Sequence, residues 1–157
     1  MKTLAIGNDT KIINFAIFYG NKLSSYGKIE NEANVTLYDS LSTILKENEI
    51  AFVVLQAIDF DKTTRRYALE AVKVRTVIKL VCEKLGVIYT TPSTYGFDRF
   101  FFGDRIQGKK LKDEKLKIAN DMYDLNIDNE DLAEAIILGW AFQKNQLKTL
   151  KEGVYMV

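Results

Sequence analysis

Histidine is absent from this 157-residue chain, which excludes histidine general bases, histidine metal ligands and Ser-His triads. Cysteine occurs once, at Cys82, so no internal disulfide can form and a reducing compartment is expected. Because Cys82 lies within an apolar helical pattern, we expect its thiol to be buried in the core. The chain also lacks a signal peptide, a lipidation motif and an apolar run of membrane-spanning length. These absences predict a cytoplasmic protein.

An excess of charge of either sign is lacking as well. The chain has 22 Lys and Arg against 21 Asp and Glu, a formal net charge of +1. This balance gives no long-range field that would attract nucleic acid to the whole surface, so any basic surface has to be local. The length and a hydrophobic content of 47% predict one globular domain, residues 1–157, with a substantial core.

Short apolar runs alternate with helical patterns along the chain. Three strands are predicted first, at 3–6, 12–18 and 23–29. The elements predicted after them are a helix at about 35–48, a strand at 50–55, a helix at about 63–85, a strand at 86–91, and helices at about 111–124 and 128–144. This order predicts an α/β fold, in which a mixed five-stranded sheet combines a three-strand antiparallel meander with parallel strands and is flanked by helices.

The predicted helix at 63–85 is apolar around much of its circumference. One stripe consists of Tyr67, Ala71, Val74, Ile78, Val81 and Leu85, and it is widened by Leu69, Val72 and Val77. A helix with so wide an apolar surface usually buries two faces. We expect the second face to meet a partner subunit, which predicts a homodimer.

Acidic residues stand at two places where they could support chemistry. Asp9 follows the first strand, where a sheet can hold its carboxylate rigidly; alternatively, it only bonds the amides of the turn. Asp128 is predicted as the N-cap of the last helix, with Asp131 on the same face; alternatively, both acids only complement the helix dipole. Aspartates without His or Cys suit Mg²⁺, with Mn²⁺ as a substitute. Paired ions of this kind clamp the attacking and leaving oxygens in phosphodiester cleavage.

Two stretches resemble motifs of the Holliday-junction resolvases. The first is Ile6-Gly7-Asn8-Asp9 followed by Lys11-Ile12-Ile13-Asn14-Phe15-Ala16. It is similar to Gly-Ile-Asp-Pro-Gly of the bacterial RuvC branch, and to the mitochondrial and poxvirus branch, in which an Asp stands two before Gly-Ile-Lys-Asn-Phe-Ala. The second is Asp128-Asn129-Glu130-Asp131-Leu132-Ala133-Glu134-Ala135-Ile136, which resembles the closing Asp-x-x-Asp-Ala-x-Ala-x-Ala of RuvC.

Two shorter stretches between them add to the resemblance. Val72-Lys73-Val74-Arg75-Thr76-Val77 is similar to the Gln-Ala-Arg-Gly stretch of the family's long helix, and Glu114-Lys115 to a Glu-Lys before its penultimate helix. The order of elements agrees from residue 1 to about 143. The resemblance implies an RNase H-like fold, a homodimer, and symmetric, metal-dependent nicking of four-way DNA junctions. Carried over by position, the metal ligands would be Asp9, Asp128 and Asp131.

The chain departs from the family at its second catalytic position. The family has a glutamate at the end of the strand before the long helix, and this chain has Gln56. An amide oxygen can contact a metal ion but adds no negative charge. Three interpretations stay open: the substitution disables the enzyme, Asp59 or Asp61 supplies the carboxylate, or the protein binds junctions without cutting well. Asn8, where the family usually has an apolar residue, is a further departure.

Basic and aromatic residues predict a DNA-binding surface. Lys62, Arg65 and Arg66 open the long helix, whose N-terminus also favours phosphate. Phe60 occupies a loop from which family members insert an aromatic side chain at the crossover. The whole predicted set is Lys11, Phe60, Lys62, Arg65, Arg66, Arg75, Lys109, Lys110, Lys112 and Lys115. Alternatively, the lysine-rich stretches are ordinary solvated surface.

The sequence therefore predicts a RuvC-like, Mg²⁺-dependent endonuclease that resolves four-way DNA junctions, with a disabled form as one interpretation of Gln56. The alternative is a non-catalytic module of the same fold that holds branched DNA. The small size and the mixed first motif favour a phage version, which would act in the cytoplasm of a bacterial host. An actin-like or sugar-kinase ATPase shares the strand–Asp–Thr–turn beginning, but this chain is too short for two lobes and has no glycine-rich phosphate loop.

Overall fold

The computed structural model describes residues 1–7, 9–58, 64–92, 98, 102, 103, 106 and 108–151, with the backbone alone for 145–151. The elements are β1 (Lys2–Ile6), β2 (Ile12–Tyr19), β3 (Lys22–Glu30), α1 (Asn34–Glu47), β4 (Phe52–Leu55), α2 (Arg65–Leu85), β5 (Ile88–Thr90), α4 (Lys109–Tyr123) and α5 (Glu130–Lys151). The strands form one sheet in the order β3-β2-β1-β4-β5. β2 pairs antiparallel with β1 and β3, whereas β4 pairs parallel with β1 and β5. The predicted mixed sheet is confirmed.

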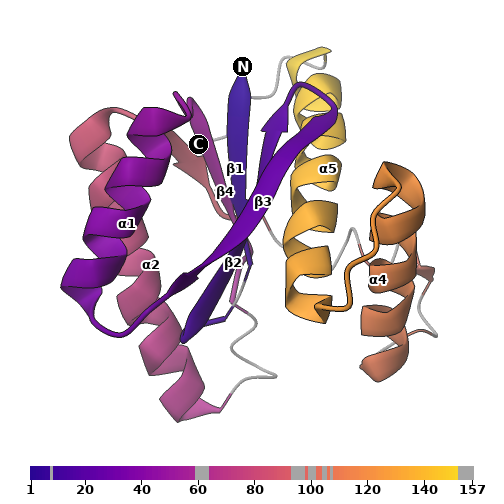
Figure 1. Ribbon diagram of the computed structural model, residues 1–157, viewed down its shortest axis with the longest axis horizontal. Coiled ribbons are helices and arrows are strands. Elements are labelled where there is room, and N and C mark those ends of the chain that lie inside the picture. The colour runs from indigo at the N-terminus through magenta and orange to yellow at the C-terminus, as the bar shows by residue number, and fades with distance from the viewer. Residues whose placement is uncertain are drawn as a thin grey trace.

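Helices cover both faces of this sheet (Figure 1). α1 and α2 enclose one core with it, built around buried side chains such as Leu41 and Ile78. α5 lies on the other face, with α4 beside it, and encloses a second core that includes Ile136. α5 approaches the sheet closely at Gly139, where any Cβ would collide with the ring of Phe18. β4 and most of β1 are therefore buried on both faces, as the wholly apolar sequence of β4 requires.

The helix predicted at 63–85 is α2, which begins at Arg65. Its N-cap is Thr64, whose Oγ1 accepts a hydrogen bond from the N–H of Tyr67 at 3.3 Å. Cys82 on this helix is fully buried as predicted, and burial raises the pKa of its thiol to about 12. Such a thiol stays protonated and unreactive.

Several expectations differ from the structure at element ends. The last helix begins at Glu130 rather than at 128, and it continues to Lys151 instead of ending near 144. Within the described part of the chain, no helix is long and apolar enough to cross a membrane.

Candidate functional site

The ends of β1 and β4 bring the first candidate residues together. These strands are parallel neighbours, with Ile6 paired to Leu55, so the chain leaves the sheet side by side at Gly7 and Gln56. The N–H of Gln56 continues the ladder by donating to the carbonyl of Ile6 at 3.4 Å. The carboxyl ends of central parallel strands are the usual place for a site in an α/β sheet.

Gly7 joins this edge of the sheet to the start of α5. A Cβ at Gly7 would lie 3.5 Å from the carbonyl oxygen of Asp131 and 3.9 Å from the Cβ of Ala135. These are ordinary van der Waals distances, so the end of β1 lies against the first turn of α5. The segment that carries Asp9 and the helix turn that carries Asp131 are therefore neighbours.

Asp9 organises the turn that follows β1. Its Oδ1 accepts hydrogen bonds from the N–H groups of Thr10 at 2.6 Å and Lys11 at 3.0 Å. Asn31 supports the same turn, since its side chain donates to the carbonyl of Thr10 at 2.9 Å. The interpretation of Asp9 as a turn residue is thus correct for one oxygen. It does not exclude a metal ligand, because a carboxylate has a second oxygen.

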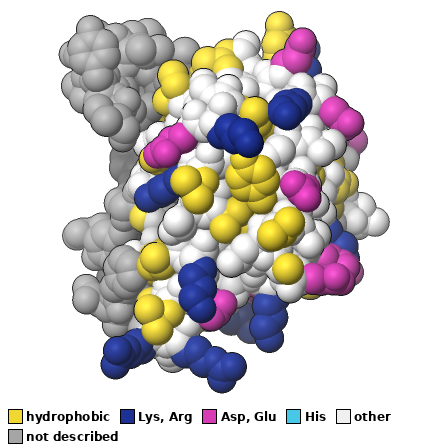
Figure 2. Space-filling view, turned by 90° about the vertical axis from the view of Figure 1, so that its left-hand side faces the viewer, with side chains coloured by type: hydrophobic (Ala, Val, Ile, Leu, Met, Phe, Trp, Pro, Cys, Tyr) yellow, Lys and Arg dark blue, Asp and Glu magenta, His cyan; other side chains and the backbone are white. Residues whose placement is uncertain are grey.

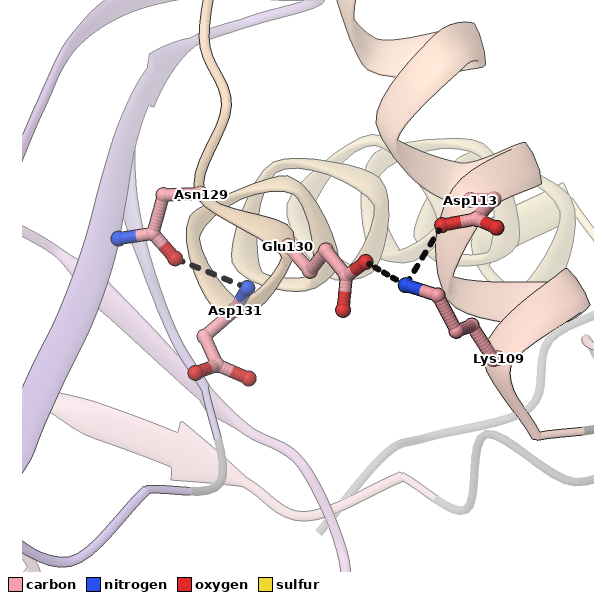
Figure 3. Close-up of polar contacts among 5 residues, drawn as sticks. All are labelled: Lys109, Asp113, Asn129, Glu130 and Asp131. Atoms are coloured by element: carbon pink, nitrogen blue, oxygen red, sulfur yellow. Dashed lines mark hydrogen bonds and ion pairs between the residues drawn. The ribbon is translucent and has the colours of Figure 1, made fainter.

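Asn129, not Asp128, caps α5. The Oδ1 of Asn129 accepts hydrogen bonds from the N–H of Asp131 at 3.0 Å and of Leu132 at 3.1 Å (Figure 3). The prediction of Asp128 as the N-cap was wrong by one residue, because Asn and Asp cap about equally well and local sequence does not choose between them. Asp128 is instead exposed, with its carboxylate outside the cap. Figure 3 also shows that the Asp131 carboxylate points away from Glu130, which reaches Lys109 of α4.

Asn14 of β2 was missed by the sequence analysis as a functional candidate. It is 3% exposed, and its Oδ1 accepts a hydrogen bond from Nδ2 of Asn129 at 3.1 Å. Its backbone carbonyl accepts from the N–H of Gly7 at 3.0 Å. The signal available in the sequence was a lone amide side chain within the apolar run of β2.

Glu134 and Tyr67 were also missed. Burial raises the pKa of Glu134; Lys115 and Lys112 act in the opposite direction, and Asp131 adds to the increase. Burial likewise raises the pKa of Tyr67, followed by the negative charge of Asp9 and, more weakly, of Asp131 and Glu134. The Tyr67 phenol of α2 therefore lies within electrostatic range of both acidic segments. In the sequence, Glu134 stood one turn after Asp131, and Tyr67 was assigned to the core.

Gln56 is half-buried, and its Oε1 is fully buried without a hydrogen-bond partner among the described residues. A buried acceptor in that state favours a cation or a donor. Together with Asp9, Asp128 and Asp131 it forms a set of hard oxygen donors whose chemistry fits Mg²⁺ or Mn²⁺. Across the described residues, however, no three acidic, histidine or cysteine side chains are close enough to form a preassembled metal site. Asn8, Asp59 and Asp61 lie outside that part of the chain.

The predicted DNA-binding residues divide into two groups. Those exposed to solvent are Lys11, Arg65, Arg66, Lys109, Lys110 and Lys112. Lys109 is held by Glu130 at 3.4 Å and Asp113 at 3.6 Å. Arg75 and Lys115 are instead buried, at 9% and 4% exposure, and Lys115 Nζ lies 3.0 Å from an oxygen of Asp98. Phe60 and Lys62 lie outside the described residues.

The burial of Lys115 and Arg75 changes what the sequence predicted for them. Their charged ends lie in the interior, beside Asp98 and Tyr67 respectively, rather than on a surface that DNA could reach in this conformation. Lys115 and Asp98 balance each other's charge within the protein, and removing Lys115 leaves the charge of Asp98 uncompensated.

The chain matches no protein-family model, and none of the curated proteins matches it in sequence. Its structure is similar to Thermus thermophilus RuvC, with a TM-score of 0.76, 10% identity, and coverage of 95% of this chain and 98% of that one. The fowlpox virus resolvase bound to substrate Holliday-junction DNA is similar with a TM-score of 0.66 and 17% identity, over 94% of this chain and 99% of that one. The yeast mitochondrial Holliday-junction resolvase Ydc2 is similar with a TM-score of 0.58 and 12% identity, over 93% of this chain and 80% of that one. The chain therefore has the RNase H-like fold that these three Holliday-junction resolvases share.

Proposed function

We propose that this protein is an endonuclease that resolves Holliday junctions with the help of a divalent metal ion. The observation that supports this best is the contact between the end of β1 and the start of α5, at Gly7 and Asp131. It joins the segment of Asp9 to that of Asp131 in a fold shared with resolvases from three sources, two of which have also been solved with junction DNA.

The metal ligands would be Asp9, Asp128 and Asp131, with Gln56 offering a neutral amide oxygen. When bound, the ion would offset the negative charge that develops on the phosphodiester oxygens and lower the pKa of a water molecule. The protein itself fixes the geometry, through the Asp9 turn and the capped start of α5. Tyr67 keeps its proton at neutral pH because its pKa is raised, so its hydroxyl is a hydrogen-bond donor near these acids.

The exposed cations would hold the DNA backbone. Arg65 and Arg66 lie at the N-terminus of α2, where free backbone N–H groups and the helix dipole also favour phosphate. Lys110 and Lys112 are exposed on the first turn of α4. Because the net charge of the chain is near zero, affinity would depend on these few contacts and fall steeply with added salt.

A homodimer would present two such sites to a junction. Leu69, Val72 and Leu80 recur along one stripe of α2 and are 55%, 44% and 52% exposed. Figure 2 shows apolar side chains among lysines and arginines on the face that α1 and α2 form. A C₂ dimer packed through this stripe would bury it, and its symmetry would match the two-fold symmetry of a four-way junction.

A second candidate function is junction binding without efficient cleavage. The observation that favours it is Gln56, whose amide stands where the resemblance expects a carboxylate and whose buried oxygen has no hydrogen-bond partner in the described part of the chain. With one carboxylate fewer, the ligand set offsets less of the charge of two divalent ions.

A cleavage assay separates the two functions. A synthetic four-way junction and a linear duplex of the same sequence are incubated with the protein in Mg²⁺ or in EDTA. The matched control is Asp9→Asn, because the Asn Oδ1 still accepts from the N–H groups of Thr10 and Lys11 and the turn is preserved. We expect paired nicks in the junction alone, only with Mg²⁺, and none with Asp9→Asn. Junction binding without any nick would support the second function, and absence of both would refute the proposal.

A further inference from the structure

We propose that Asn14 is a positioning residue that holds the two acid-bearing segments of the candidate site in register. This inference rests on the proposed function, since the acids concerned are its metal ligands. The structural feature behind it is a hydrogen-bonded pair of side-chain amides, the buried Asn14 of β2 and the half-buried Asn129 at the start of α5, which we call the amide clip. These residues are separated by 115 positions in the sequence.

Asn14 contacts both segments at once. Its backbone carbonyl accepts from Gly7, two residues before Asp9, at 3.0 Å. Its side-chain Oδ1 accepts from Asn129, which lies between Asp128 and Asp131, at 3.1 Å. Gly7 also lies close to Asp131, whose carbonyl oxygen would be 3.5 Å from a Cβ at Gly7. A shift of α5 along the sheet would therefore break the clip.

The orientation of the clip is determined by the helix cap. Asn129 Oδ1 already accepts from the N–H groups of Asp131 and Leu132, so its Nδ2 is the atom left to face β2. Asn14 must then present its oxygen. Aspartate would cap α5 as well as asparagine but has no N–H to donate, so Asn14 would have to turn its amide over to keep the link. The hydrogen bond between the two side chains links the helix start to the sheet, which a simple cap does not require.

A site whose ligands come from two segments needs those segments at a constant separation. Residues that orient ligands from the outer shell typically change metal affinity ten- to hundred-fold when they are replaced. Within the described part of the chain, the Asn14 side chain hydrogen-bonds to Asn129, and a leucine would fill a similar volume in an otherwise apolar strand. The amide is therefore explained by positioning rather than by core packing.

The test measures Mn²⁺ affinity by calorimetry and the free energy of unfolding for the wild type, Asn14→Leu and Ile78→Val. Ile78 is buried in the core on the opposite face of the sheet, so Ile78→Val is a control for loss of stability alone. We expect Asn14→Leu to weaken Mn²⁺ binding about ten- to hundred-fold. We expect Ile78→Val to leave it unchanged. Equal Mn²⁺ affinity in Asn14→Leu and the wild type would overturn the inference.

Two further variants separate geometry from charge. In Asn129→Asp the carboxylate keeps both cap hydrogen bonds, and Asn14 can turn its amide over and donate to it, so we expect Mn²⁺ affinity to be retained. The double variant Asn14→Leu/Asn129→Asp has the same added charge and the same cap but no clip. We expect it to bind Mn²⁺ as weakly as Asn14→Leu. If the double variant instead regained wild-type affinity, charge rather than position would be responsible and the inference would be wrong.

Failure of the proposed function would look different. In that case the wild type itself would bind no Mn²⁺ and cut no junction. Amide hydrogen exchange then still decides whether the clip exists: Asn14→Leu should accelerate exchange at the N–H groups of Asp131 and Leu132, whereas Ile78→Val should not. Unchanged exchange at both amides in Asn14→Leu would refute the clip without reference to any metal.

Discussion

The substitution Gln56→Glu tests whether the missing carboxylate limits catalysis. It adds one negative charge at a side chain whose terminal oxygen is buried, at the end of the strand beside the Asp9 segment. The change is nearly isosteric, so packing and DNA docking should be preserved. If the carboxylate completes the ligand set, recovery of about 3–4 kcal/mol of transition-state stabilisation corresponds to roughly a hundred- to a thousand-fold in rate.

The same substitution should lower stability when no divalent ion is present. A buried acceptor that lacks a partner costs about 1–3 kcal/mol, and more when it is charged. Burial and the nearby acids would raise the pKa of the new carboxyl group above its unfolded value of about 4.3. The loss in free energy of unfolding is therefore absent below that value and grows as pH rises through the folded pKa. Added Mg²⁺ at about 100 times its Kd should restore about 2.7 kcal/mol.

The assays are single-turnover cleavage of a four-way junction, junction binding in Ca²⁺, and urea unfolding at pH 5 and pH 8 with and without Mg²⁺. We expect Gln56→Glu to cleave much faster, bind the junction about equally, and lose stability in EDTA only at the higher pH. An unchanged rate, combined with loss of activity in Asp59→Asn or Asp61→Asn, would refute this reasoning. The fourth ligand would then come from the loop that follows β4.

Three further predictions concern separate elements. Burial raises the pKa of Glu134 above its ordinary 4.5, so the contribution of this group to wild-type stability falls as pH rises through the raised pKa. In urea unfolding, the stability of Glu134→Gln relative to the wild type should therefore be greater at pH 8 than at pH 5. The same relative stability at the two pH values would contradict this. Lys112→Glu should weaken junction binding and reduce the salt dependence of binding, without unfolding the protein. Lys115→Met should instead lower the free energy of unfolding by about 3–5 kcal/mol, because Asp98 loses its ion-pair partner. If Lys112→Glu and Lys115→Met had equal effects on binding and stability, this would be inconsistent with the exposure of Lys112 and the burial of Lys115. The wild type should have twice the 17.9 kDa mass of one chain in light scattering, and Leu80→Glu should reduce the mass to that of a single chain. A wild type with the mass of a single chain would exclude the dimer.

The sequence by itself determined the sheet and most of its helices. The apolar run over β4 predicts a strand covered on both faces, and the alternation of strands with helical patterns predicts the mixed order. The position of Asp9 after the first strand also follows from local pattern, because a polar corner between two apolar runs ends a strand. These features depend on short-range periodicity, which can be read directly from the sequence.

Only the tertiary structure decided which polar side chains meet. Asp128 and Asn129 are equally good caps by local sequence, but Asn129 is the cap and also hydrogen-bonds to Asn14, which is distant in the sequence. Lys115 belongs to a lysine-rich stretch that resembles solvated surface, yet it is buried against Asp98 because α4 packs beside α5. Arg75 is buried for a similar reason, since it lies on the face of α2 turned toward the protein. Burial and pairing of polar groups depend on contacts between distant segments, and no local pattern encodes them.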